Sequence, residues 1–367
     1  MHVGVTTPVS SFLVRAVLPI VALVVGACSD SGPPLEKASL CSGAWQPLTA
    51  PRPYDITSPL VYRDGVLYYS YLLESSSKIV ALPAAGGEES TMAPAFAWDL
   101  WLEGDHLLYV DGDGRFFSLP FDGGSPELLL DSAAGQAGPV LAWLYNVSAT
   151  DFFWAESVSF DAPTTVWRAS RSGGTPIQIG TVSATTTTSP ELAFSKMAIS
   201  GDSVILSSIL GISDAVPFDG SPSRVLAAPD APKGALVEAA GVDGTGAYWS
   251  VLEPGPASEN DAWPVMLAPA DGSPIRTFWQ GLPGHSMVDQ VWPDGTGGWV
   301  LAASQLFDDQ QYHSTIWLLA ADGTSRRLAC SPGRFIDGSI EVRPAVALDA
   351  VFAIVRGDTW QIVRIPR

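Results

Sequence analysis

Short runs in which apolar and polar residues alternate recur along the chain, in pairs joined by a glycine-rich turn. The clearest example is residues 115–130, RFFSLPFDGGSPELLL, where an aromatic run precedes Gly-Gly and a second run ends in leucine. Alternation with a period of two predicts β-strands, and a tight glycine turn between two such runs predicts a β-hairpin. The segment therefore predicts a unit of architecture and not a catalytic motif.

Weaker copies of this hairpin follow one another at regular intervals. Their turns contain Gly86, Gly123, Gly173, Gly220, Gly272 and Gly323, which lie between 37 and 52 residues apart. Repeats of this length are typical of propeller blades and of solenoids, in which each unit buries its apolar faces against its neighbours. The segments are β-branched and aromatic and lack a helical period, so a helical solenoid is not predicted for residues 41–367.

Each repeat divides into four strands, named a to d. In the second repeat these are predicted at residues 95–104, 106–111, 115–121 and 126–131, with the glycine turn between c and d. Strand b carries most of the aromatic residues, and it is predicted at residues 66–71, 106–111, 151–156, 203–208, 247–252 and 298–303. We expect these side chains to fill the wedges between adjacent blades.

The last repeat stops after three strands, predicted at residues 340–348, 350–355 and 359–365. Residues 44–50, AWQPLTA, match a fourth strand and precede the first repeat, so we expect this N-terminal strand to complete the last blade. Closure of the ring removes an unpaired strand edge. The sequence thus predicts an all-β fold with a single seven-bladed β-propeller over residues 41–367, with six or eight blades as alternatives.

A family resemblance accompanies this pattern. Aromatic strands such as FFWAE and AYWSV, followed by a strand ending in proline and by DGG-x-P-x-x-L, are similar to bacterial TolB-like propellers and distantly to YWTD-type propellers. The motif YWTD itself does not occur, and its nearest counterpart is Tyr248-Trp249-Ser250. The resemblance covers nearly all of residues 44–367 and implies a binding platform in the periplasm or at the cell surface, but propellers of this shape host many unrelated activities.

The N-terminus has the order of a secretion signal. Arg15 is followed by an apolar run over residues 16–25, about half the length needed to span a bilayer. The sequence VGAC, which ends at Cys28, resembles the lipobox of bacterial lipoproteins, in which the cysteine is lipidated and becomes the new N-terminus. The resemblance implies a signal peptide over residues 1–27 and a lipidated cysteine with a flexible tether over residues 28–40.

This resemblance also implies a membrane-anchored protein of the bacterial cell envelope. Position 29 is serine, and the absence of aspartate there favours the periplasmic face of the outer membrane or the cell surface.

The chain has 38 acidic and 19 basic residues and a formal net charge of −19, which disfavours nucleic acid as a partner because phosphates would be repelled. We expect a monomer, with the membrane contacted through the lipid.

Catalytic motifs are not found in the sequence. It contains no G-x-S-x-G elbow, no H-E-x-x-H and no phosphate-binding G-x-x-x-x-G-K, and its histidines are not spaced as metal ligands. Residues 111–114, DGDG, begin like a calcium loop but lack the closing glutamate, so they predict a hairpin turn. We therefore predict no cofactor and no metal.

Cys41 and Cys330 are the other two cysteines, and secretion would expose them to an oxidising compartment. Two alternatives stay open, a disulfide or two separate thiols. The predicted topology places them at opposite ends of a strand, roughly 17 to 20 Å apart, whereas the Cα atoms of a disulfide lie within about 7 Å.

The topology also separates two faces of the disc. The a–b and c–d turns share one face, the turn face, together with both ends of the domain; the b–c loops and d–a connections share the other, the loop face. The longest b–c loops are predicted at residues 157–165, 253–262 and 305–314. Long loops in a compact repeat usually indicate function or disorder, so a ligand site and variable loops without a ligand are both open here. Candidate binding residues in them are Phe160, Asp161, Glu253, Glu259, Asp261, Phe307, Asp308, Asp309, Tyr312 and His313.

Two functional classes follow. The first is a lipid-anchored, non-catalytic recognition or scaffolding propeller, whose b–c loops bind a protein, peptide or glycan on the face opposite the membrane tether. The second is a propeller hydrolase or lyase that acts on envelope or extracellular polysaccharide through paired carboxylates from different blades. Two carboxylates facing each other across the axis would favour the enzyme.

Overall fold

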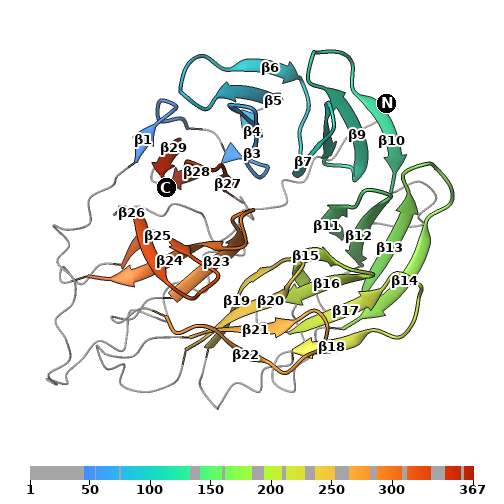
Figure 1. The fold of residues 1–367 in the computed structure, drawn as a ribbon. Coiled ribbons are helices and arrows are strands. Elements are labelled where there is room, and N and C mark those ends of the chain that lie inside the picture. Colours follow the sequence, from blue (N-terminus) through green and yellow to red (C-terminus); the bar gives the residue numbers. More distant parts are fainter. Residues whose placement is uncertain are drawn as a thin grey trace, which may run out of the picture.

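The structure, a computed structural model, describes most of the chain downstream of the predicted tether. The described residues are 45–53, 55–73, 76–132, 141–158, 162–183, 194–208, 212–227, 236–252, 264–281, 287–307, 312–331, 344–356 and 359–367. They form 29 strands in seven antiparallel sheets around one axis (Figure 1). These residues contain no helix, and hence no helix that could cross a membrane.

Three blades are built from the first part of the chain. Blade 1 contains β2 (Asp55–Ile56), β3 (Val61–Arg63), β4 (Val66–Leu73), β5 (Ser76–Pro83) and β6 (Ser90–Ala93). Blade 2 contains β7 (Asp99–Glu103), β8 (His106–Val110), β9 (Arg115–Pro120) and β10 (Glu127–Asp131). Blade 3 contains β11 (Leu141–Val147), β12 (Asp151–Ser157), β13 (Thr164–Ser170) and β14 (Ile177–Val182).

The next three blades repeat this order. Blade 4 contains β15 (Phe194–Ser200), β16 (Ser203–Ser208), β17 (Ser213–Pro217) and β18 (Arg224–Ala227). Blade 5 contains β19 (Leu236–Val242), β20 (Gly246–Leu252), β21 (Val265–Pro269) and β22 (Arg276–Trp279). Blade 6 contains β23 (Met287–Pro293), β24 (Trp299–Leu306), β25 (Tyr312–Leu319) and β26 (Ser325–Ser331).

Blade 7 joins the two ends of the domain. It contains β27 (Ala345–Val346), β28 (Ala350–Arg356), β29 (Trp360–Pro366) and, from the N-terminal side, β1 (Gln46–Pro47). β1 pairs with β29 over two residues, and the amide of Leu48 extends the contact by donating to the carbonyl of Ile362 at 2.9 Å. The predicted seven blades and the predicted closure by the N-terminal strand are both confirmed.

Strand a is shorter than predicted in blades 2 and 7. In blade 2 the predicted residues 95–104 reduce to β7, Asp99–Glu103. The prediction of residues 340–348 reduces to the two residues of β27, and residues 340–343 lie outside the described part of the chain. In blade 1 the strand is interrupted between β2 and β3, where the Thr57 hydroxyl donates to the Oγ of Ser70 at 3.3 Å and to the carbonyl of Ala97 at 3.2 Å. These side-chain bonds replace a part of the ladder in that blade.

One apolar cluster lies between each pair of neighbouring blades, which gives seven clusters around the ring. The predicted aromatic b strands supply much of them. Phe152 is 1% exposed and lies 4.6 Å from Phe116, which comes from strand c of the preceding blade. The prediction that aromatic residues of strand b fill the wedges is therefore confirmed by their burial.

The leucine of the repeated P-x-x-L motif has a defined place. In blades 1 to 6 the pairing of strands c and d shifts by one residue, which leaves one apolar residue of strand d bulged: Met92, Leu129, Ile179, Leu226, Phe278 and Leu328. Each bulged side chain packs onto an inter-blade cluster. Bulges increase the local twist and interrupt pairing, so the outermost strand of these blades is a poor template for another chain.

The repeated Asp-Gly turns close through the aspartate side chain. The carboxylate of Asp271 accepts a hydrogen bond from the amide of Ser273 at 2.8 Å, and Asp219 and Asp322 make the same bond two residues on. Gly272 follows with a φ of 79°, a left-handed conformation that glycine adopts without steric cost. The turn motif is thus explained by local backbone chemistry.

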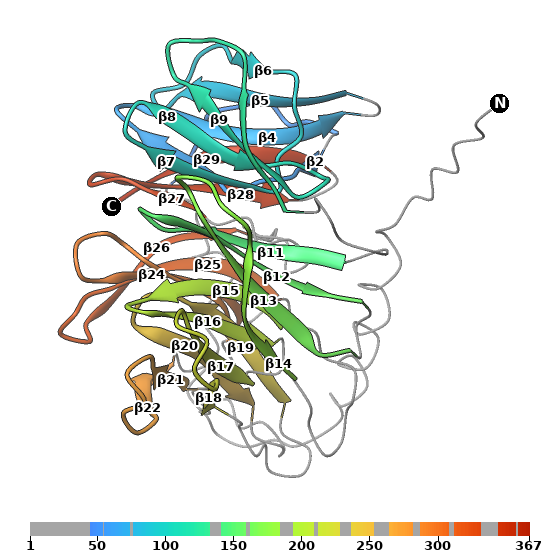
Figure 2. The ribbon, with the colours of Figure 1, turned by 90° about the vertical axis from the view of Figure 1, so that its right-hand side faces the viewer.

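Both ends of the described domain lie on the turn face, as predicted. Gln46 lies opposite Arg364, three residues before the last residue, and the amide of Arg367 donates to the carbonyl of Asp349 in the a–b turn of blade 7. Seen from the side, the C-terminus is on the same side of the disc as the turn between β21 and β22 (Figure 2).

Candidate functional site

The described part of the propeller has a cavity of about 730 Å³ on its axis, where all seven blades contribute to the lining. The lining comes mainly from strand a of each blade and from the a–b turns, so the cavity occupies the turn-face half of the axis. A volume of this size is within the range of small-molecule and peptide sites. Its residues form three levels, which are described from the turn face inward.

The mouth of the cavity is charged. Arg171, in the c–d turn of blade 3, donates from both terminal nitrogens to the carboxylate oxygens of Glu103 in blade 2. The same guanidinium reaches the carbonyls of Ser148 and Ala149 at 3.2 and 3.4 Å. This bidentate pair bridges two blades and fixes the side of the opening.

Asp243 is the third charged residue at the mouth. Its carboxylate accepts hydrogen bonds from the amides of Thr245 at 2.6 Å and Gly246 at 3.2 Å and from the hydroxyl of Tyr248 at 3.0 Å. Burial raises the pKa of Tyr248, which keeps this hydroxyl protonated as a donor. The two carboxylates at the mouth, Glu103 and Asp243, are therefore held in bonds within the propeller.

An apolar collar lies below the mouth. It is formed by side chains near the ends of the a strands, Tyr62, Trp101, Ile199, Trp292 and Val346. The outer sides of these rings are packed: Tyr62 stacks on Phe352 at 5.4 Å. The collar is rigid on the protein side and presents apolar surface to the axis.

The floor of the described cavity is polar. Asp99, Lys196 and Gln290 come from blades 2, 4 and 6 and lie three or four residues before their strands end. Lys196 and Gln290 each follow a one-residue bulge of strand a. Gln290 is only 7% exposed, and no hydrogen bond of its amide is present within the described residues.

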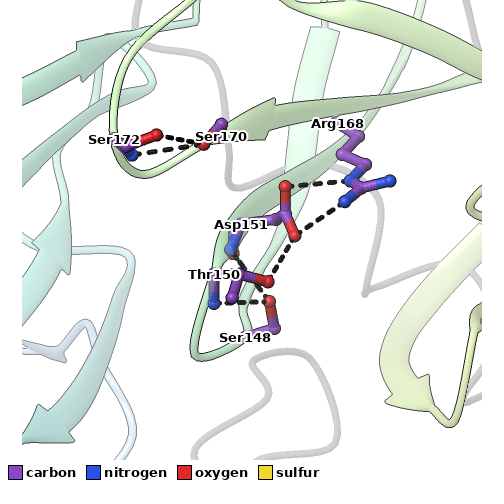
Figure 3. A network of polar contacts seen from close by, with 6 residues as sticks. All are labelled: Ser148, Thr150, Asp151, Arg168, Ser170 and Ser172. Carbon is purple, nitrogen blue, oxygen red and sulfur yellow. Dashed lines mark hydrogen bonds and ion pairs between the residues drawn. The ribbon is translucent and has the colours of Figure 1, made fainter.

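A polar network at the turn face of blade 3 positions Ser148 at the mouth (Figure 3). Asp151 accepts from the Nε and Nη2 of Arg168 at 2.9 and 3.0 Å and from the hydroxyl of Thr150 at 2.6 Å. The Oγ of Ser148 accepts from the amides of Thr150 and Asp151. Burial acts to raise the pKa of Asp151, but its bonds to Arg168 and Thr150 outweigh this and lower it.

This network connects two blades. The Arg168 guanidinium lies 5.5 Å from the centre of the Phe218 ring in the c–d turn of blade 4, and Phe218 stacks on Phe153 at 4.7 Å. Because Asp151 is 4% exposed and bonded through both oxygens, it holds the two blades together and is not open to a ligand.

The b–c loop residues that the sequence predicts as a binding face are mostly outside the described residues. These are Phe160, Asp161, Glu253, Glu259, Asp261, Asp308 and Asp309. Of the others, Tyr312 is the first residue of β25, Phe307 is fully buried, and His313 is 6% exposed with its ring 4.7 Å from that of Phe307. Phe307 and His313 thus pack at the base of their loop. The loop-face site stays a prediction, and the described cavity lies at the other end of the axis.

Cys330 is buried at the loop-face end of β26 and is bonded in a disulfide. The alternative of a free thiol at this position is therefore wrong. Its partner is outside the described residues, so the pairing with Cys41 stays a prediction. The separation of Cys41 and Cys330 that was predicted from the length of one strand takes no account of the residues between Cys41 and β1.

The DGDG segment of blade 2 forms a hairpin turn, as predicted. Asp111 receives hydrogen bonds from the amides of Asp113 and Arg115 at 2.9 and 3.0 Å, and its other oxygen binds the Arg115 guanidinium at 2.6 Å. An arginine thus occupies the place a cation would take. Within the described ranges, no group of three or more histidine, cysteine or acidic residues could hold a metal ion.

One buried carboxylate lies away from the axis. Asp214, on β17 between blades 3 and 4, is 5% exposed, and its neighbours across the sheet are Leu206 and Val225. Burial raises its pKa to about 6. The outer strand of blade 3, β14 (IQIGTV), packs against β17 and contains no ionisable residue that would compensate the charge.

We expect Asp214→Asn to stabilise the protein at neutral pH. Because the folded pKa is above the ordinary value of 3.8, the folded state holds the proton more tightly, and stability falls as pH rises from about 4 to 6. The neutral amide should raise the free energy of unfolding by up to about 3 kcal/mol at pH 7.5 and leave it unchanged at pH 3.5. Urea unfolding at both pH values measures this. Equal effects at the two pH values would contradict it.

The sequence contained a signal for the cavity floor that was not recognised. Lys196 and Gln290 are polar residues inside the otherwise apolar a strands FSKMAIS and MVDQVWP. A polar residue in the innermost strand of a propeller indicates the axis, because both faces of that strand are covered by neighbouring blades. The bulges before these residues depend on the pairing register of strands a and b, which cannot be predicted from composition.

No protein-family model matches this sequence, and a search of curated proteins found no relative. Solved structures show the likeness in fold. An oligogalacturonate lyase in complex with manganese has a TM-score of 0.65 at 13% identity and covers 91% of this chain and 96% of its own. The protein YCF48 bound to D1 peptide has a TM-score of 0.54 at 9% identity, with 92% and 100% covered.

A TolB structure from Agrobacterium tumefaciens is also among the similar structures, with a TM-score of 0.42, 16% identity, and 76% and 94% of the two chains covered. The neighbours thus include a TolB propeller, as the sequence resemblance implies, but at this score the likeness carries no argument about function. The structural neighbours include both an enzyme and proteins that carry no enzyme name, and at these identities they show the fold alone.

Proposed function

We propose that the protein is a non-catalytic recognition propeller of the bacterial envelope that binds a peptide, protein or glycan ligand on its axis. The observation that carries this proposal is the axial cavity of about 730 Å³, to which every blade contributes. A site built by all seven blades on their innermost strands is rigid before the ligand arrives, which lowers the entropic cost of binding.

The state of the charged groups supports binding over catalysis. A general acid or base must exchange a proton with its substrate, whereas Glu103 is paired with Arg171 and Asp243 is bonded to its own turn and to Tyr248. The remaining ionisable residues of the lining, Asp99 and Lys196, are of opposite charge and do not form a carboxylate pair.

The proposal keeps the lipid anchor on Cys28 and the tether that follows it, with the protein at the periplasmic face of the outer membrane or at the cell surface. The described domain begins on the turn face, and the cavity opens on that face as well. The predicted b–c loop face would surround the opposite end of the same axis. The axial cavity would therefore open on the same face of the disc as the tether.

A variant that fills the cavity tests the function. Leu102 lines the cavity and is 38% exposed, so Leu102→Trp should narrow the opening without disturbing a packed wedge. We expect crosslinking in native envelopes to capture a partner with the wild-type protein and to lose it, at least tenfold, with Leu102→Trp. The matched control is Leu128→Trp on the outermost strand of the same blade, where Leu128 is 52% exposed. Equal capture by both variants would contradict an axial site.

An enzyme is the second candidate, because the lyase with a TM-score of 0.65 has the same architecture. Incubation of the purified protein with polygalacturonate or with envelope polysaccharide, followed by chromatography of the products, separates the two. Shortened chains produced by the wild type but not by Leu102→Trp would replace the recognition proposal with a catalytic one. Intact polysaccharide, together with partner capture, supports recognition.

A further inference from the structure

Gln290 is a buried polar residue that the packing of the fold does not explain. It lines the floor of the axial cavity at 7% exposure, directly after the bulge at Asp289, and its amide has no hydrogen-bond partner within the described residues. The amide atoms are accessible from the cavity, so they are available to a ligand that binds there. The bulge directs this amide into the cavity.

A primary amide has one acceptor and two donors, which match the N–H and C=O of a peptide group. The surroundings offer the same chemistry, because strand a is the edge of each described blade and is paired only with strand b. Its other edge presents unpaired backbone groups toward the axis, the arrangement that binds extended peptides by strand addition.

The charge around the mouth indicates which peptides would enter. Every a–b turn has an aspartate in it or directly beside it: Asp64, Asp105, Asp151, Asp202, Asp243, Asp294 and Asp349. Asp151 and Asp294 lie in buried pairs with arginine. Asp64, Asp105 and Asp349 pair with Arg63, His106 and Arg364 at the surface, where their side chains stay 87%, 88% and 70% exposed. Asp202 is exposed and accepts a hydrogen bond from the hydroxyl of Ser203. An acidic rim above a cavity concentrates cationic ligands.

We propose that the cavity binds an extended peptide segment with basic side chains, which enters from the turn face. Its backbone would pair with the amide of Gln290, and its basic side chains would lie among the aspartates of the rim. Gln290 is three residues from the end of β23, roughly 10 Å below the mouth, a depth that three or four extended residues span. The proposal rests on the axial site of the proposed function and names its ligand class.

The test uses the purified protein and two fluorescein-labelled octapeptides, one alternating lysine and alanine and one alternating glutamate and alanine. Fluorescence anisotropy should show binding of the lysine probe and none of the glutamate probe at equal concentration. Gln290→Met keeps the side-chain volume but removes the amide, and it should weaken binding of the lysine probe about tenfold. The matched control is Gln178→Met on exposed strand β14, which should leave binding unchanged.

Charge is tested separately. Asp202→Asn should weaken the lysine probe about threefold at low salt, and the difference should vanish at 0.5 M salt, where charges are screened over about 4 Å. Glu127→Gln on the outer rim removes the same charge away from the axis and should have no effect. A lysine probe that carries a photoreactive group should crosslink to strand a residues, which keeps the test valid if Gln290→Met unfolds.

Failure of the ligand class and failure of the function are distinguishable. If Leu102→Trp abolishes partner capture but the lysine probe does not bind, or binds Gln290→Met and wild type alike, the peptide proposal is overturned and the axial site stands. If neither Leu102→Trp nor Gln290→Met changes any binding, both proposals are overturned.

Discussion

Replacing Cys330 by alanine is expected to lower the free energy of unfolding by about 3 kcal/mol and the melting temperature by on the order of 5 °C. Cys330 is 2% exposed on the outermost strand of blade 6 and is bonded in a disulfide. The neighbouring blade 7 is closed by a short segment in which β1 pairs over two residues and Leu48 and Arg52 add further backbone bonds to β29. A covalent bond beside so short a closure stabilises the ring by restricting the unfolded chain.

Thermal unfolding with and without a reducing agent measures this effect. The reduced wild type and Cys330→Ala should melt together, below the oxidised wild type. Mass spectrometry of the digested, unreduced protein identifies the partner, for which we predict Cys41. Identical melting of the reduced and oxidised protein would show that the disulfide makes no contribution, and a bond from Cys330 to Cys28 would contradict lipidation of Cys28.

Replacing Arg367 by methionine is expected to cost about 3 kcal/mol, because it leaves a buried carboxylate with one partner fewer. Arg367 donates to Asp294 of blade 6 at 2.6 Å and to the carbonyl of Ala347 at 3.1 Å. The two side chains are 11% and 3% exposed. This pair links blade 7 to blade 6.

The matched control is Arg364, which lies on β29 three residues before Arg367. Arg364 pairs with Asp349, whose side chain is 70% exposed, so Arg364→Met should cost less than about 1 kcal/mol. Denaturant unfolding of the two variants measures the difference. Equal losses would show that burial of the partner carboxylate does not decide the cost.

The pH dependence of the Arg367 variant has a predictable sign. Burial acts to raise the pKa of Asp294, but bonds from Thr296, Gly298 and Arg367 outweigh it and lower the pKa. A lowered carboxyl pKa contributes stability above the ordinary value near 3.8, and this contribution is lost as pH falls through the folded pKa. The wild type should therefore lose more stability than Arg367→Met on acidification from pH 6 to pH 3.

The fold could be predicted from the sequence because the repeats contain the same type of turn between strands c and d. The Asp-Gly turns form by hydrogen bonds between neighbours, such as Asp271 to Ser273, and therefore leave a local pattern. The closing strand was found by elimination, since the last repeat lacked its fourth member. Strand a was predicted less well, because β3 and β27 are short and are held by contacts from other blades.

The candidate site could not be predicted in the same way. Long loops can be recognised in a sequence from the spacing of the strands. The cavity is made from strand residues that are far apart in the chain, such as Asp99, Lys196 and Gln290. The bulges that turn Lys196 and Gln290 inward depend on pairing register. Likewise, Glu103 and Arg171 are 68 residues apart, and only the closed ring brings them together.

The closing strand has a mechanical consequence if the chain is anchored at its N-terminus. A pull on the anchor would reach the propeller through β1, whose pairing with β29 spans Gln46 and Pro47. Within the other blades, neighbouring strands pair over several residues and distribute a force over many hydrogen bonds. The pairing of β1 with β29 distributes it over few. The ring would then open at blade 7 under tension before any other blade separates.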